Sequence, residues 1–133
     1  MVEFALVLPV LLLILLGILK FGIVFNNYIT LTDSVRIGAR QLALSRGLPA
    51  SPSDPCTLAE NASSTNSQNT LSTGSITYTP SFSGPETCGN SATSWVEGDT
   101  ATLRASYPCN LTFMGINFYP GCTLTAQASE AIE

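Results

Sequence analysis

The sequence has no histidine, and only five of its 133 residues are basic. The lack of histidine removes the usual general base, the usual partner of a Ser or Cys nucleophile and the commonest metal ligand. It also excludes a c-type haem with a histidine ligand, because there is no Cys-x-x-Cys-His sequence. The acidic residues are scattered; Glu97 and Asp99 flank Gly98 and indicate a turn rather than a calcium site or an acid–base pair. We therefore expect no catalytic residues, no metal and no cofactor.

Basic residues are especially rare beyond the first third of the chain. From residue 47 onward only Arg104 is basic, whereas seven residues are acidic: Asp54, Glu60, Glu86, Glu97, Asp99, Glu130 and Glu133. A surface that follows a phosphate backbone needs clustered Lys and Arg. We expect no nucleic-acid partner for this part of the protein.

The N-terminus lacks the features of a secretory signal peptide. No positive charge precedes the apolar run at residues 4–25, and no Ala-x-Ala-like site closes it. A single carboxylate, Glu3, stands at its start. As a helix the run spans about 33 Å, enough to cross a hydrocarbon core of roughly 30 Å. We predict a helix stored in a membrane and then packed against copies of itself.

Four residues interrupt the apolar run. Pro9 is expected to kink or loosen the helix, because it lacks a backbone N–H. Gly17 and Gly22 allow another backbone to approach closely. Lys20 either snorkels to the lipid headgroups or pairs with another subunit. The predicted assembly contacts are Glu3, Phe4, Pro9, Gly17, Lys20 and Gly22.

The helix is expected to continue to about residue 46. An apolar stripe recurs at spacings of three and four, formed by Tyr28, Leu31, Val35, Ala39 and Leu42. Arg46, Gly47 and Pro49 then form a stop signal. We divide the chain into an apolar helix half (1–25), an amphipathic half packed on the protein's own domain (26–47), and a loop-rich outer domain (48–133).

The outer domain is predicted to be an antiparallel β domain. Residues 57–75 hold almost no large apolar side chains and are predicted to form a disulfide-ordered loop or a mobile surface segment, outside the core. Candidate strands cover residues 75–79, ended by Pro80, and the alternating segments 101–107 and 122–129; residues 94–96 form another strand or approach a turn. We expect a sheet of three or four strands packed on the amphipathic helix half, and thus an α+β fold.

The four cysteines all lie in the outer domain. Their spacings are unlike those of a zinc site, and an even number favours disulfides. Three pairings are possible, of which we favour Cys56–Cys88 and Cys109–Cys122. Asn61 and Asn110 match the N-glycosylation pattern, although such triplets often arise by chance.

Three N-terminal motifs resemble the TadE-like family of pilins and pseudopilins: VEFALVLP at residues 2–9, FG at 21–22 and RIGAR at 36–40. The resemblance covers residues 2–47 and is looser in the β region. It implies a type IV pilin-like precursor that a prepilin peptidase cuts and an inner-membrane platform extrudes. In such proteins the glutamate usually lies at the fifth mature position, whereas here it is third, and Lys20 stands where an acidic residue often precedes Phe-Gly.

The resemblance implies a structural subunit of an extracellular, cell-surface filament that is held in the inner membrane before assembly. Two alternatives remain, a minor pseudopilin that primes or tips the filament and a single-pass membrane-anchored binding protein. Whether the filament serves adhesion, motility, colonisation or DNA uptake stays open.

The two charges of the apolar segment need partners in an assembled bundle. Glu3 and Lys20 lie about 25 Å apart along the helix and cannot pair within one subunit. We favour a contact between Glu3 and the α-amino group of a neighbouring copy, and the alternative joins Glu3 to Lys20 of a displaced copy. An isolated Glu3 would also suit the helix macrodipole.

Overall fold

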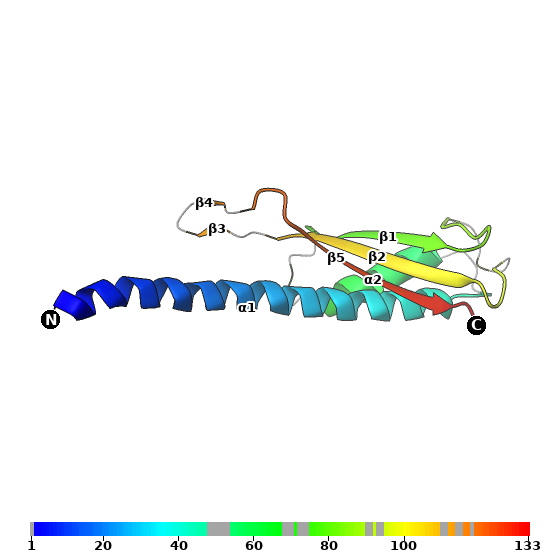
Figure 1. Ribbon diagram of the computed structural model, residues 1–133. Helices are drawn as coiled ribbons and strands as arrows, with labels where there is room; N and C mark the ends of the chain where they lie inside the picture. The colour runs from blue at the N-terminus through cyan, green and yellow to red at the C-terminus, as the bar shows by residue number, and fades with distance from the viewer. Residues whose placement is uncertain are drawn as a thin grey trace.

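The computed structural model describes residues 2–47, 54–67, 71, 75–89, 92, 95–109, 112–113, 116–117 and 119–133. A long helix, α1 (Val2–Ala43), is followed by a shorter helix, α2 (Pro55–Ser67), and by strands β1 (Thr77–Phe82), β2 (Thr100–Pro108), β3 (Thr112–Phe113), β4 (Ile116–Asn117) and β5 (Thr123–Ala131). The sheet and α2 lie alongside the second half of α1, and the first half extends beyond them (Figure 1). The α+β class predicted from the sequence is confirmed.

Helix α1 has 42 residues and is about 63 Å long at 1.5 Å per residue. It ends at Ala43, three residues before the predicted end, and residues 44–47 form a turn. Gly47 closes this turn with a φ of 80°, a conformation that suits glycine, and its N–H donates to the carbonyl of Ala92 at 3.0 Å.

The main sheet has the order β1-β2-β5, with both pairs antiparallel. In β2 the side chains of Ala101, Leu103 and Ala105 are buried, as the alternating pattern predicted. The prediction that Pro80 ends the first strand is wrong, because β1 continues through Pro80 to Phe82. Strand β1 lies at the edge of the sheet. Proline is tolerated there because the N–H that it lacks would point away from β2 and would make no hydrogen bond within the sheet.

The loop predicted for residues 57–75 is wrong over residues 57–67, because residues 55–67 form α2. The reason is that α2 packs through small residues rather than large apolar ones. Its buried face consists of Pro55, Cys56, Ala59, Ser63 and Ser67. The buried hydroxyl of Ser63 donates to the Ala59 carbonyl at 2.8 Å, so its burial leaves no donor unsatisfied. Asp54 precedes the helix, and its Oδ1 accepts from the Cys56 N–H at 3.4 Å in the manner of an N-cap.

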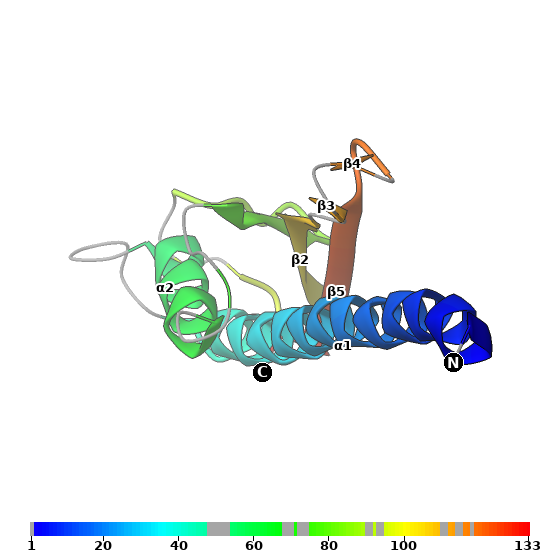
Figure 2. The same cartoon turned by 90° about the vertical axis from the view of Figure 1, so that its left-hand side faces the viewer.

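Helix α1 contacts α2, β2 and β5 (Figure 2). Its buried stripe contributes to one apolar cluster with the sheet, formed by Leu31, Val35, Ala39, Leu71, Leu103, Ala105 and Ala126. A second cluster joins the helix end to α2 and the chain terminus through Leu42, Cys56, Ala59, Ala92, Trp95, Ala101 and Ile132. The predicted packing of the sheet on the amphipathic half of α1 is therefore confirmed. Trp95 lies outside the strands and contacts Phe82, with ring centroids 4.9 Å apart.

The lack of a side chain at Gly38 allows α1 and α2 to pack closely. A Cβ at this position would overlap Ser63 Oγ and the Leu103 side chain, and would lie 3.1 Å from the Ala59 carbonyl oxygen. No larger residue fits here unless its neighbours move.

Both disulfides join cysteines that are neighbours in the sequence. Cys56 of α2 is bonded to Cys88 in the β1–β2 connection, and Cys109 is bonded to Cys122. This is the connectivity favoured from the sequence. The second bond closes the segment that contains β3 and β4; among the described strands these two pair with each other and with no other.

Candidate functional site: the uncovered half of α1

The first half of α1 is an apolar surface that the rest of the described residues leave uncovered. Eighteen large hydrophobic side chains between Phe4 and Ile29 are exposed. Phe4 is 75% exposed and Phe21 is 73% exposed, whereas Leu31, just beyond the end of this surface, is fully buried. The boundary between the two halves of α1 thus coincides with the edge of the outer domain.

This helix is long and apolar enough to cross a membrane. The span begins at Leu6, and its most apolar window has a mean hydropathy of 2.7 and no buried residues. By length and composition it is the one such helix in the described part of the chain. An anchor in a lipid bilayer is therefore compatible with the structure.

The backbone of α1 is continuous through the positions that interrupt its apolar sequence. Pro9 lies inside the helix, and a Cβ added at Gly17 or at Gly22 would meet nothing within 4 Å. Neither glycine is therefore required by packing within the subunit, in contrast to Gly38. Five residues of an α-helix correspond to a rotation of about 140°, so Gly17 and Gly22 mark two different faces of α1.

Of the two charged side chains in the apolar segment, the structure describes that of Lys20 but not that of Glu3. Lys20 is exposed, with no ion pair or hydrogen bond to the described residues. Glu3 lies in the first turn of α1, but its side chain is outside what the structure describes. The proposed pairing of Glu3 with a neighbouring α-amino group or with a neighbouring Lys20 stays a prediction.

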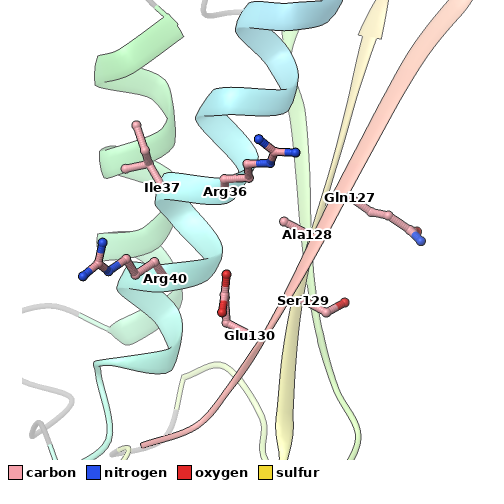
Figure 3. A pocket seen from close by; sticks show the side chains of 7 residues that line it. All are labelled: Arg36, Ile37, Arg40, Gln127, Ala128, Ser129 and Glu130. Carbon is pink, nitrogen blue, oxygen red and sulfur yellow. The ribbon is translucent and has the colours of Figure 1, made fainter.

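The second half of α1 borders a groove against β5, with a volume of about 460 Å³. Arg36 and Arg40 extend from the helix, and Glu130 projects from β5 into the space beside it (Figure 3). In the described parts of the chain these side chains form no ion pair, since the single salt bridge there joins Arg46 and Glu97 at 3.0 Å. The groove combines two cations and one anion, and nothing in its chemistry identifies a particular ligand.

A pair of carboxyl groups, Glu86 and Asp99, lies in the β1–β2 connection and was not recognised from the sequence. Burial by itself would raise the pKa of Glu86, but hydrogen bonds from the backbone N–H groups of Glu86, Val96 and Gly84 and a hydrogen bond with Asp99 lower the pKa. The pKa of Asp99 is raised by its hydrogen bond to Glu86, by desolvation and by the negative charge of Glu86.

The sequence contains little that would reveal this pair. The two residues are thirteen positions apart and meet only because β1 pairs with β2 so that Phe82 lies opposite Ala101. The Ser83 N–H then donates to the Thr100 carbonyl, and Asp99 lies directly before Thr100. The predicted turn at residues 97–99 is present, with Gly98 at a φ of 92°, but Asp99 faces Glu86, and Glu97 binds Arg46.

The two candidate glycosylation sites have different outcomes. Asn61 is exposed on α2, and its carbonyl accepts hydrogen bonds from Ser64 and Thr65. Asn110 lies outside the described residues. Modification of either residue stays a prediction.

The family model of TadE-like proteins matches residues 1–40. The resemblance noted in the sequence is thereby confirmed for α1, and it ends before α2 and the sheet. It suggests a pilus-related, structural protein. Neither the curated proteins nor the solved structures contain a match to this chain.

Proposed function

We propose that this protein is the repeating subunit of a type IV pilus-like extracellular filament and polymerises through the first half of α1. The observation that carries the proposal is the apolar surface between Phe4 and Ile29, which the other parts of the chain that the structure describes leave uncovered. The match to TadE-like proteins over the same helix supports a pilus-related role.

The glycines of this surface support packing against copies of the same helix. In an apolar bundle the helices associate through close backbone approach at small residues, because lipid is as apolar as the side chains. Gly17 and Gly22 have open space around them in the subunit and lie on different faces of α1. A helix inside a bundle needs such positions on more than one side.

The proposed route to the filament begins in the inner membrane. A prepilin peptidase processes the chain, the membrane holds α1, and an assembly platform then moves α1 into the filament core. The acidic outer domain faces outward in this arrangement.

Electron cryo-microscopy of filaments sheared from producing cells tests the proposal. We expect this chain to repeat along the whole helical lattice, with Gly17 and Gly22 in contact with neighbouring α1 helices. A lattice built from another protein would refute the major-subunit role. The chain would then be a minor pseudopilin if it is found at the filament tip, and a membrane-anchored protein if it is absent from filaments.

Variants test the contact surface separately. Gly17→Leu and Gly22→Leu should abolish filaments while the outer domain unfolds at the same temperature as in the parent protein, because neither side chain meets anything within the subunit. Ile18→Leu, at an exposed neighbouring position, conserves volume and is the matched control that should still assemble. Normal filaments from both glycine variants would contradict the proposed interface.

A further inference from the structure

The carboxyl groups of Glu86 and Asp99 face a common space beside Gly84. A Cβ at Gly84 would overlap both Glu86 Oε2 and Asp99 Oδ2, so the two oxygens lie on the same open side of this glycine. Glu86 is 8% exposed; its Oε1 accepts from the Val96 N–H at 3.1 Å, whereas its Oε2 has no donor among the described groups when Asp99 is ionised. A buried carboxylate oxygen without a donor is costly, and a second carboxylate opposite it adds repulsion.

Either a proton or a cation can compensate two carboxylates in this position. Ser83 supplies a third oxygen, because its hydroxyl hydrogen-bonds to the Asp99 carboxyl group and also accepts from the Thr100 N–H at 2.8 Å. The three groups are all hard oxygen ligands, which favour calcium over zinc or other metals that prefer nitrogen and sulfur.

We propose that Glu86, Asp99 and Ser83 form a calcium site in the β1–β2 connection. The described residues contain no group of three or more acidic, His or Cys side chains that would hold a metal, so water must complete the coordination. A site of this kind is weak, with a dissociation constant on the order of 10⁻⁴ to 10⁻³ M, as in extracellular calcium modules.

The site would fasten the end of the molecule farthest from the N-terminus (Figure 1). The backbone of Asp99 already holds the C-terminal segment, since its carbonyl accepts from the Ile132 N–H at 2.7 Å. The neighbouring Gly98 N–H donates to the Ile132 carbonyl at 3.0 Å. Calcium bound between Asp99 and Glu86 would link the C-terminal segment, through Asp99, to the part of the β1–β2 connection that contains Glu86. The Cys56–Cys88 disulfide already joins that part to α2. The inference does not depend on filament assembly.

Terbium luminescence is the direct test, because Trp95 is the only tryptophan of the chain and immediately precedes Val96, whose N–H binds Glu86. The full chain in detergent, freed of metals with EDTA and then dialysed, should sensitise bound Tb³⁺ on excitation of Trp95. Calcium should displace the signal at about 0.1–1 mM. In parallel, 10 mM CaCl₂ should raise the unfolding temperature by about 6–11 °C, and 10 mM MgCl₂ should raise it much less.

Three single variants separate this site from binding elsewhere on the acidic domain. Glu86→Gln and Asp99→Asn should lose both responses to calcium. Glu97→Gln is the matched control, because Glu97 lies in the same connection but is exposed and binds Arg46; this variant should keep both responses. Two variants at the site keep the test valid if one of them does not fold.

Two results would overturn the proposal. If the parent protein shows neither displaceable terbium nor a calcium-dependent rise in unfolding temperature, the two carboxyl groups share a proton and bind no cation. If Glu97→Gln loses the responses as completely as Glu86→Gln, calcium binds to the general negative surface and not to this site.

Discussion

Replacing Gly38 with alanine should destabilise the outer domain, although alanine is the better helix former. Gly38 lies in the middle of the second half of α1, where that helix meets α2 and β2. The added methyl group would overlap Ser63 Oγ and the Leu103 side chain and would come within 3.1 Å of the Ala59 carbonyl oxygen. The last of these atoms belongs to the backbone of α2 and moves only if that helix moves.

Two opposing effects set the magnitude. Overpacking a well-packed core costs about 1–3 kcal/mol, and an overlap that involves two side chains and a backbone atom belongs near 3 kcal/mol. Glycine in a helix interior is about 1 kcal/mol less favourable than alanine, and the substitution regains this amount. The expected net loss is about 2 kcal/mol, which lowers the unfolding temperature of a domain of this size by roughly 8 °C.

Thermal and urea denaturation of the full chain in detergent, followed by circular dichroism, would measure the effect. The Ser63→Gly background removes one of the two overlapping groups, so Gly38→Ala should cost less there than in the parent protein; the difference is the coupling energy of the pair. The reasoning is refuted if Gly38→Ala raises the unfolding temperature, because the position would then behave as an exposed helical glycine.

Three further stability predictions concern the outer domain, and urea denaturation checks each. Leu103→Ala, at a fully buried position in the main cluster, should cost about 2–5 kcal/mol, and a loss below 1 kcal/mol would contradict the assigned core. Replacing Cys56 and Cys88 together by alanine should cost about 3–4 kcal/mol from the opened loop, since the bond spans 32 residues; an unchanged midpoint would argue against this pairing. Arg46→Ala should cost less than about 0.5 kcal/mol, because its ion pair with Glu97 is solvent-exposed, and a loss above 1 kcal/mol would show a role that this contact does not explain.

The parts of the fold that large apolar residues specify were predictable from the sequence. The spacing of Leu31, Val35 and Ala39 indicated the buried stripe of α1, and the alternation around Leu103 indicated β2. Helix α2 was missed because its buried face relies on Ala59 and Ser63, which carry almost no hydrophobic signal and become core residues only opposite Gly38. Periodicity of small residues is informative only when the partner helix is known.

The candidate contact surface was predictable to a similar extent. An apolar run with one acid at its start identifies a helix that needs a partner, and the structure agrees that the outer domain does not supply one. The Glu86–Asp99 pair was not predictable, because its two members meet through the register of β1 and β2 and through the space that Gly84 leaves open. The local sequence predicts the turn at residues 97–99, but it does not predict that Asp99 in this turn lies against Glu86.

The exposed half of α1 also bears on what would drive the proposed assembly. Full burial of one large apolar side chain stabilises by about 1.5–3 kcal/mol, so the eighteen exposed side chains represent tens of kcal/mol, more than the 5–15 kcal/mol that typically stabilises a folded domain. The helix must therefore be covered by lipid or by other subunits. Lipid and neighbouring helices cover apolar side chains about equally well, so burial alone does not move the subunit from the membrane into a filament. In the proposed filament, the preference would come from groups that lipid satisfies poorly. These are the helix backbones that approach one another at Gly17 and Gly22, and the Glu3 carboxylate if it pairs with a neighbouring copy. These positions should control assembly more strongly than any single leucine or isoleucine of the same surface.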